Sequence, residues 1–214
     1  MTIHEIKRTV SNYFTNKILE HGPTHWGVDW NSTESQRLRF SQLLKIVTND
    51  VEVDKTEILI NDFGCGYGAL YDYTVETGNN FFYVGLDVSK EMISCAQQLH
   101  EDNPRVRFTL DEYELPLAEY TIASGIFNIK FKFNDTDWLA YVLKCIETMA
   151  LKSAKGFSFN CLTTYSDPEY MRDDLYYADP CFFFDYCKKQ FSRNVALLHD
   201  YELYEFTILV RKTW

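Results

Sequence analysis

Apolar and polar positions along the chain fall into blocks that alternate between a strand-like and a helix-like period. Between Trp138 and Met149, for example, apolar residues recur every three or four positions, which is the spacing of a helix. The strand-like runs are 56–63, 80–88, 105–110, 120–129 and 156–165, and the main helical segments are 68–77, 89–102, 135–156 and 181–192. This alternation predicts a parallel sheet covered by helices.

Several end signals support these elements, and the pattern changes near the C-terminus. Ser89 and Asp135 are plausible helix N-caps, and Gly156 is a candidate helix stop. Two strand-like runs within 194–212 are separated only by residues 200–204. Because that gap is too short for a crossover helix, the two runs are predicted to form an antiparallel hairpin.

The N-terminal segment, residues 1–50, has helical spacing and precedes the predicted sheet. It could pack beside the first strand or cover a site as a lid, and Trp26 and Trp30 favour the lid. We therefore expect a single domain over residues 1–214, with a helical lid at 1–50 and an α/β core at 55–214.

Charge and cysteine usage narrow the function classes. The 214 residues carry 31 acidic and 21 basic side chains, so the net charge of −10 disfavours a nucleic-acid partner. The six cysteines include no CxxC pair, and the N-terminus lacks the apolar core of a signal peptide. We expect reduced thiols, a cytoplasmic location, no membrane span and no metal site. The oligomeric state is left open.

A cluster of glycines follows the first predicted core strand. Gly64, Gly66 and Gly68 occupy the first strand-to-helix turn, where the ligand of an open parallel sheet approaches the backbone most closely. Asp87 closes the next strand, where an acid can accept two hydrogen bonds from ribose hydroxyls. Together these features predict an adenosine-containing ligand, whereas the plainer interpretation is a turn that needs glycine only for tight packing.

The same turn also fits the dinucleotide fingerprint of dehydrogenases, because it reads Gly64-x-Gly66-x-x-Ala69. Asp62 argues against a dinucleotide, because a carboxylate two residues before the first glycine suits a ligand that carries an ammonium group. The tight glycine spacing suits a nucleoside without a pyrophosphate, and the terminal hairpin is a third distinction. An NAD-dependent oxidoreductase and a noncatalytic nucleoside-binding protein remain the alternatives.

The motifs resemble those of class I S-adenosylmethionine-dependent methyltransferases over roughly residues 55–214. The matching stretches are "NDFGCGYG", "YVGLDVSKEMI", "RFTLDEYELP" and "IASGIFNI", in the family's order. The resemblance implies a Rossmann-like sheet of seven strands, mostly parallel, with helices on both faces and "EFTILVRK" as the antiparallel last strand. It also implies S-adenosylmethionine as the cofactor.

The resemblance assigns residues to parts of that cofactor. Asp62 would lie near the methionine moiety, Asp87 would bind the ribose, and the end of the fourth strand at Gly125 would face the sulfonium. The remaining expected contacts are the glycine turn (Gly64, Cys65, Gly66, Gly68), the adenine site (Val88, Met92, Asp111, Glu112) and Arg39 on the cofactor carboxylate.

Two positions depart from the family pattern. Thr121 stands where the family often has an acid just before the fourth strand, which affects a detail and not the assignment. No Asn-Pro-Pro-Tyr type segment follows the fourth strand, so methylation of amino groups on nucleobases or glutamine has no support and a small-molecule acceptor is expected. The outer segments are similar to small bacterial methyltransferases of surface-polysaccharide and capsule pathways. This similarity implies O-methylation of a sugar, a sugar nucleotide or a phosphorus-containing capsule precursor.

A general base is needed only if the acceptor proton has a high pKa, as in a sugar hydroxyl. His199, His25 and Tyr165 are the candidate catalytic residues, although lone residues of these types are more often surface or packing residues. We expect the acceptor pocket to combine 24–31, 125–128 and 160–179, with Trp26, Trp30, Tyr165, Tyr176 and Tyr177 as its aromatic wall.

Overall fold

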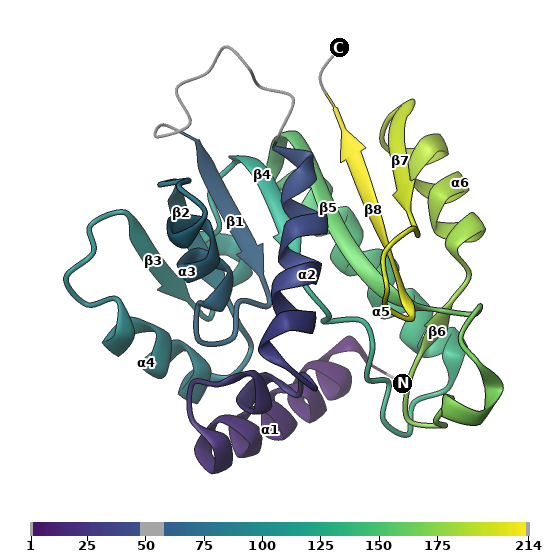
Figure 1. The fold of residues 1–214 in the computed structure, drawn as a ribbon, viewed down its shortest axis with the longest axis horizontal. Helices are drawn as coiled ribbons and strands as arrows, with labels where there is room; N and C mark the ends of the chain where they lie inside the picture. The colour runs from purple at the N-terminus through teal and green to yellow at the C-terminus, as the bar shows by residue number, and fades with distance from the viewer. Residues whose placement is uncertain (1, 48–57, 213–214) are drawn as a thin grey trace.

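The computed structural model describes residues 2–47 and 58–212. Within them the strands form one sheet in the order β3-β2-β1-β4-β5-β8-β7, and a short β6 lies beside β5 (Figure 1). The strands are β1 (Leu59–Phe63), β2 (Phe82–Leu86), β3 (Val106–Thr109), β4 (Ala118–Ala123), β5 (Ser153–Thr163), β6 (Tyr177–Ala178), β7 (Asn194–Leu198) and β8 (Glu205–Arg211).

Pairing is parallel from β3 through β5, whereas β8 is antiparallel to both β5 and β7. The predicted terminal hairpin is therefore confirmed, with β7 ending at Leu198 and β8 beginning at Glu205. The predicted α/β fold class, a mostly parallel sheet with an antiparallel last strand, is confirmed as well.

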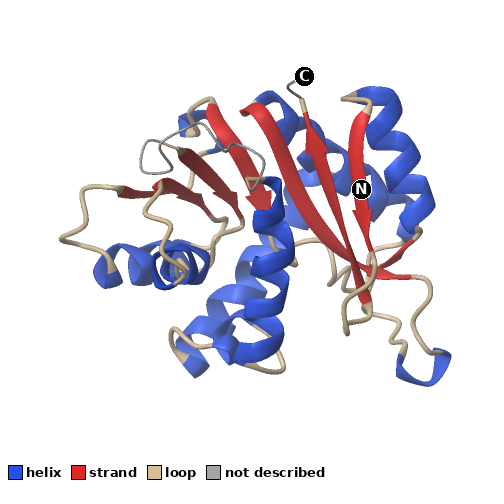
Figure 2. Ribbon diagram, turned by 45° about the horizontal axis from the view of Figure 1, so that its top comes forward, coloured by secondary structure: helices blue, strands red, loops and turns tan. Residues whose placement is uncertain are grey.

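Helices cover both faces of the sheet (Figure 2). The cluster under α5 and α6 includes the fully buried Trp138, Phe159 and Phe183, and the opposite cluster joins Leu43 of α2 to Leu70 of α3. The helices are α1 (Ile3–His21), α2 (Thr33–Leu43), α3 (Ala69–Glu76), α4 (Lys90–Leu99), α5 (Asp135–Leu151) and α6 (Pro180–Gln190), with short 3-10 turns η1 (His25–Val28), η2 (Leu44–Ile46), η4 (Glu112–Glu114) and η5 (Pro168–Tyr170).

Strand β5 presents different chemistry to the two layers. Successive side chains of a strand point to opposite faces, and Phe157 and Phe159 belong to the apolar cluster of α5 and α6. Between them Ser158 faces the other layer, where its hydroxyl donates to the Leu43 carbonyl at 3.0 Å, and Asn160 follows on the same side. Helix α2 thus packs against the buried polar side chains of Ser158 and Asn160, and these contacts help to position the site.

Some element boundaries differ from the sequence prediction. The helix expected to stop at Gly156 ends at Leu151, because β5 already begins at Ser153. Gly156 lies inside β5, where a Cβ would come within 2.4 Å of the Val210 carbonyl oxygen. Its N-cap is Asn134, not Asp135, whereas Ser89 caps α4 as predicted by accepting from the Met92 N–H.

The predicted fourth strand, 120–129, is also shorter than expected, since β4 ends at Ala123 and Gly125 turns the backbone at a φ of 72°. The end of the second predicted N-terminal helix at 48–50 and the start of the first core strand at 56–57 lie outside the described residues.

Candidate functional site

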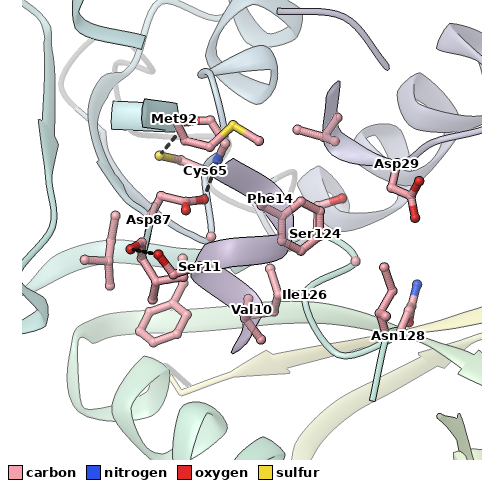
Figure 3. Close-up of a pocket in the computed structure, with 18 of the residues that line it drawn as sticks. Val10, Ser11, Phe14, Asp29, Cys65, Asp87, Met92, Ser124, Ile126 and Asn128 are labelled. Atoms are coloured by element: carbon pink, nitrogen blue, oxygen red, sulfur yellow. Dashed lines mark hydrogen bonds between the residues drawn. The ribbon is translucent and has the colours of Figure 1, made fainter. Parts of the chain in front are cut away.

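A cavity of about 1000 Å³ lies at the carboxyl ends of β1, β2 and β4. Strand β1 is the point where the sheet order reverses, since β2 lies on one side of it and β4 on the other, and open α/β sheets bind ligands at such points. Helices α1 and α2, the segment at the end of η1, the residues after β3 and side chains from the β5 side supply the remaining walls. Figure 3 shows Asp87 and Ser11 at one end of this pocket and Asp29 and Asn128 at the other.

The pocket gathers most of the residues that the sequence assigned to a cofactor. Gly68 is the exception among them. The lining includes Asp62, Gly64, Cys65, Gly66, Asp87, Val88, Met92, Asp111, Glu112, Gly125 and Arg39.

The glycine turn is shaped by its own backbone and by its neighbours. Gly64 and Gly66 have φ values of 89° and 54°, in the left-handed region that favours glycine. A Cβ at Gly64 would lie 2.2 Å from Ile126, and one at Gly66 would lie 2.9 Å from Val28. Both neighbours also line the pocket, so the turn requires glycine even before a ligand enters.

Gly68 lies behind this turn and outside the cavity lining. It has a φ of 94° at the N-terminus of α3, and a Cβ there would come within 2.9 Å of His100 and 3.1 Å of Phe108. These contacts belong to α4 and β3 packing. The structure therefore gives Gly68 a packing role, which is the plainer of the two interpretations of the glycine cluster.

Asp87 joins the two turns at the ends of β1 and β2. Its carboxylate accepts the Gly66 N–H at 2.9 Å and the Ser89 N–H at 2.9 Å, one on each oxygen. Burial raises the pKa of Asp87, while these backbone bonds oppose that shift. Each carboxylate oxygen still has acceptor capacity for a ligand hydroxyl.

Asp62 is a deeply buried acid of the pocket, with 2% of its surface exposed. The Tyr83 hydroxyl donates to Oδ2, whereas Oδ1 is buried without a hydrogen-bond partner among the described residues. Burial raises the pKa of Asp62 to about 7. A cationic group in the pocket would stabilise its charged form. Burial also raises the pKa of the Cys65 thiol well above its usual value, so Cys65 is not an activated nucleophile.

Helix α1 closes the Asp87 end of the pocket through polar contacts. Ser11 donates its hydroxyl to the Val88 carbonyl at 2.9 Å, and Thr15 donates to the Glu91 carboxylate at 2.8 Å. Lys7 pairs with Glu112 at 2.6 Å. These three contacts place α1 across the turns after β2 and β3. No sequence motif marked Ser11 or Thr15, because their role depends on where α1 docks.

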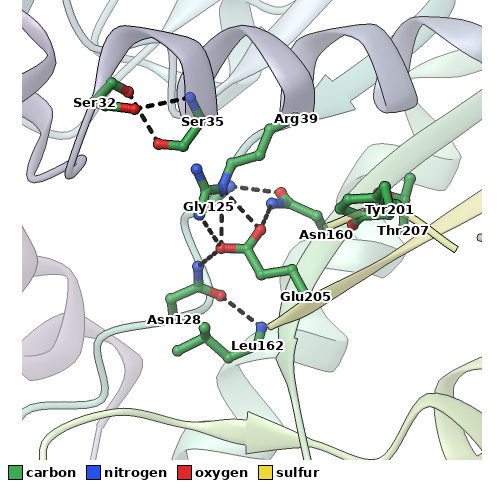
Figure 4. Close-up of polar contacts among 10 residues, drawn as sticks. All are labelled: Ser32, Ser35, Arg39, Gly125, Asn128, Asn160, Leu162, Tyr201, Glu205 and Thr207. Carbon is green, nitrogen blue, oxygen red and sulfur yellow. Dashed lines mark hydrogen bonds and ion pairs between the residues drawn. The ribbon is translucent and has the colours of Figure 1, made fainter. Parts of the chain in front are cut away.

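The other end of the pocket rests on a buried polar network (Figure 4). Arg39 of α2 donates to Glu205 at the start of β8 from Nε at 2.9 Å and from Nη2 at 2.8 Å. Asn160 and Asn128 also donate to this carboxylate, and Asn160 accepts the Gly125 N–H at 2.7 Å. The network thereby fixes the loop after β4.

The three candidate catalytic residues lie outside the cavity lining. His199 follows β7, and its ring is 5.8 Å from that of Tyr165, whose side chain is 69% exposed. His25 lies on η1 with its ring 4.7 Å from the Trp26 ring. The structure brings His199 and Tyr165 together, but beside the hairpin and not at the cavity.

Only some residues of the segments expected to form the acceptor pocket line the cavity. Trp30 and the loop residues Gly125 and Asn128 line the cavity, and Asn160 acts through Gly125. From the expected segment 160–179 the lining residues are Leu162 in β5 and Arg172 and Leu175 after it, in place of the aromatic residues expected there.

A family model described as a methyltransferase domain matches residues 60–150. The chain is also 53% identical over 153 residues to a Mycobacterium tuberculosis protein named "Putative methyltransferase Rv1506c", and the match covers 72% of this chain and 92% of that relative. The chain therefore belongs to the methyltransferase family, as its motifs indicated.

Solved methyltransferase structures share the fold. Magnesium protoporphyrin IX methyltransferase of Synechocystis PCC 6803, solved with bound SAM, has a TM-score of 0.66 at 16% identity, with 97% of each chain covered. N-methyltransferase NodS of Bradyrhizobium japonicum WM9, in complex with S-adenosyl-l-homocysteine, has a TM-score of 0.63 at 14% identity, covering 96% of this chain and 99% of NodS. The bifunctional kinase-methyltransferase WbdD has a TM-score of 0.59 at 16% identity, covering 92% of this chain and 45% of WbdD.

No helix within residues 2–47 and 58–212 is long and apolar enough to span a membrane. The same residues contain no group of three or more His, Cys, Asp or Glu side chains that could hold a metal ion.

The raised pKa of Asp62 predicts a pH dependence of stability. Between the ordinary value of 3.8 and about 7, the folded protein binds a proton that the unfolded chain has released. The free energy of unfolding therefore falls as pH rises through that range. Asp62→Asn removes this titration, so the cofactor-free variant should lose less stability than the wild type between about pH 5 and about pH 8 in urea unfolding.

Asp87 titrates in the same direction and remains in the variant, so part of the pH dependence will persist. Asp102→Asn, at an exposed position after α4, is the matched control and should keep the wild-type dependence. If the free energy of unfolding of Asp62→Asn changed with pH in parallel with that of the wild type, burial would not be raising the pKa of Asp62.

Proposed function

We propose that the protein transfers a methyl group from S-adenosylmethionine to a small-molecule acceptor. The observation that carries this proposal is that Asp62 and Asp87 both line the pocket, near the carboxyl ends of the adjacent parallel strands β1 and β2, together with the glycine turn after β1. The unpartnered Oδ1 of Asp62 suits the ammonium of the methionine moiety. Asp87 suits the ribose hydroxyls, since it lies at the end of the second strand.

The protein's part in the reaction is binding and alignment. The cofactor would supply an electrophilic methyl group on a sulfonium, and methyl transfer is an in-line displacement that needs the acceptor held in register. Gly125, held by Asn160, lies at the strand end expected to face the reacting atoms. Helix α1 would exclude water from the cavity by covering the turns after β2 and β3.

The specific acceptor we propose is a sugar or a precursor of capsule or surface polysaccharide, methylated on oxygen. Support comes from the similarity of the outer sequence segments to methyltransferases of such pathways. Related folds serve a porphyrin methyltransferase and an N-methyltransferase, so fold alone does not select the acceptor. A cytoplasmic location and the lack of a nucleic-acid partner stay predictions from the sequence.

Parallel calorimetric titrations with S-adenosylmethionine, S-adenosylhomocysteine and NAD test the proposal against its rivals. We expect both sulfur nucleosides to bind and NAD to give no saturable heat, because the pocket offers Asp62 to an ammonium. Saturable NAD binding without a response to either sulfur nucleoside would favour an oxidoreductase. Binding of the nucleosides with no methyl transfer to any acceptor would favour the noncatalytic alternative.

Asp87→Ala tests the ribose contact. Loss of hydrogen bonds to a charged acceptor should weaken S-adenosylhomocysteine binding by about 2 to 3 kcal/mol, which is a roughly 30- to 140-fold higher Kd. Calorimetry measures the change, with Asp102→Ala as the exposed control that should leave the Kd unchanged. A wild-type Kd in folded Asp87→Ala would remove Asp87 from the cofactor site.

The proposed lid function of residues 1–50 predicts an effect on ligand release. Ser11→Ala deletes the hydrogen bond from α1 to the Val88 carbonyl, a neutral bond of about 0.5 to 1.5 kcal/mol. S-adenosylhomocysteine should then dissociate roughly two- to tenfold faster in stopped-flow displacement. Ser94→Ala, at an exposed position on α4, is the control. Equal release rates for all three proteins would mean that this contact does not hold a lid closed.

A further inference from the structure

One edge of the Arg39 guanidinium has no partner within the described residues. Arg39 is 7% exposed and lines the cavity, yet its Nη1 is buried without a hydrogen bond. A buried, unsatisfied N–H group costs roughly 1 to 3 kcal/mol, so it is a site where a ligand atom gains by binding.

The charge of this guanidinium is already neutralised. Glu205 is 1% exposed and accepts from both Nε and Nη2 of Arg39. It also accepts from the amides of Asn128 and Asn160, so its position is fixed on several sides. An anion at Nη1 would place a second negative charge beside Glu205 in a site removed from water. An uncharged oxygen would satisfy the same N–H without that repulsion.

The position of Arg39 assigns it to the acceptor end of the pocket. Its partners come from β5, β8 and the loop after β4, on the opposite side of β1 from Asp87. The guanidinium also stacks on Trp30, with its carbon 3.9 Å from the ring centroid. Trp30 in turn lies against Gly125, where a Cβ would be 2.2 Å from the ring.

The walls around this end combine apolar and polar side chains. Ile129, Leu162 and Leu175 line the cavity, and so do Asn128 and Arg172. The Arg172 guanidinium is itself paired with the Asp174 carboxylate, so its charge is also neutralised. Apolar walls with a few convergent polar groups are typical of small-molecule sites.

We propose that Arg39 Nη1 binds an uncharged oxygen of the methyl acceptor, either a hydroxyl or a carbonyl, and that this subsite selects against a carboxylate or phosphate at the same place. The inference rests on the proposed methyltransferase function. It replaces the sequence expectation that Arg39 binds the cofactor carboxylate. Among the proposed acceptors it favours binding through a sugar hydroxyl over binding through a phosphate.

Acetamide and acetate test the subsite, because they have nearly the same shape and differ in charge. The protein saturated with S-adenosylhomocysteine is titrated with each probe, and the Trp30 indole NMR signal is followed. Acetamide should bind at least about tenfold more tightly than acetate, since it offers a neutral carbonyl to Nη1. Crystals of the same complex soaked in each probe should show the acetamide oxygen on Nη1.

Two variants sharpen the comparison. Glu205→Gln leaves the guanidinium charge unpaired, so the preference should move toward acetate. Arg39→Met removes the donor, so neither probe should shift the Trp30 signal. If either variant fails to fold, the wild-type pair of titrations still decides the question.

Several results would overturn the subsite. These are equal or tighter binding of acetate in the wild type, binding of neither probe, or a crystal structure with the cofactor carboxylate on Nη1. Failure of S-adenosylhomocysteine to bind would be seen before either probe is added. It would count against the proposed function and not against the subsite alone.

Discussion

The Arg39–Glu205 ion pair joins helix α2 to the sheet at the pocket, and the geometry of this end of the pocket depends on it. Both side chains are almost fully buried, and removal of one partner from such a pair costs about 3 to 5 kcal/mol. The pair therefore adds to the apolar contacts of Phe40 and Leu43 in docking helix α2 at this position. Because Asn160 binds both Glu205 and the Gly125 N–H, the same pair also fixes the loop after β4.

The alternation of side chains along β5 explains why this pair can exist. Phe157 and Phe159 complete the apolar layer under α5 and α6, while Ser158 and Asn160 face α2. One face of the strand packs into the apolar core and the other supplies the polar positions. Helix α1 is held by two kinds of contact. Ile6 and Ile18 are buried in apolar clusters, and hydrogen bonds such as that of Ser11 add polar contacts over the pocket.

The sequence could predict the parts of the site that depend on local backbone. Gly64, Gly66 and Asp87 follow from the strand-to-turn pattern, and the terminal hairpin follows from the short gap after Leu198. The sequence could not distinguish Arg39 from a solvated helical arginine, since the partner of Arg39 is 166 positions away at Glu205.

The packing role of Gly68 and the position of His199 outside the cavity were hidden for the same reason, because each depends on tertiary neighbours. Under the proposed function, the two ends of the pocket differ in charge. Asp62 and Asp87 form an acidic end for a cationic cofactor, and the neutralised Arg39 forms the other end for an uncharged acceptor. Methyl transfer removes the sulfonium charge, which weakens the attraction of the acidic end for the product. The division therefore favours release of the spent cofactor without any change at the acceptor end.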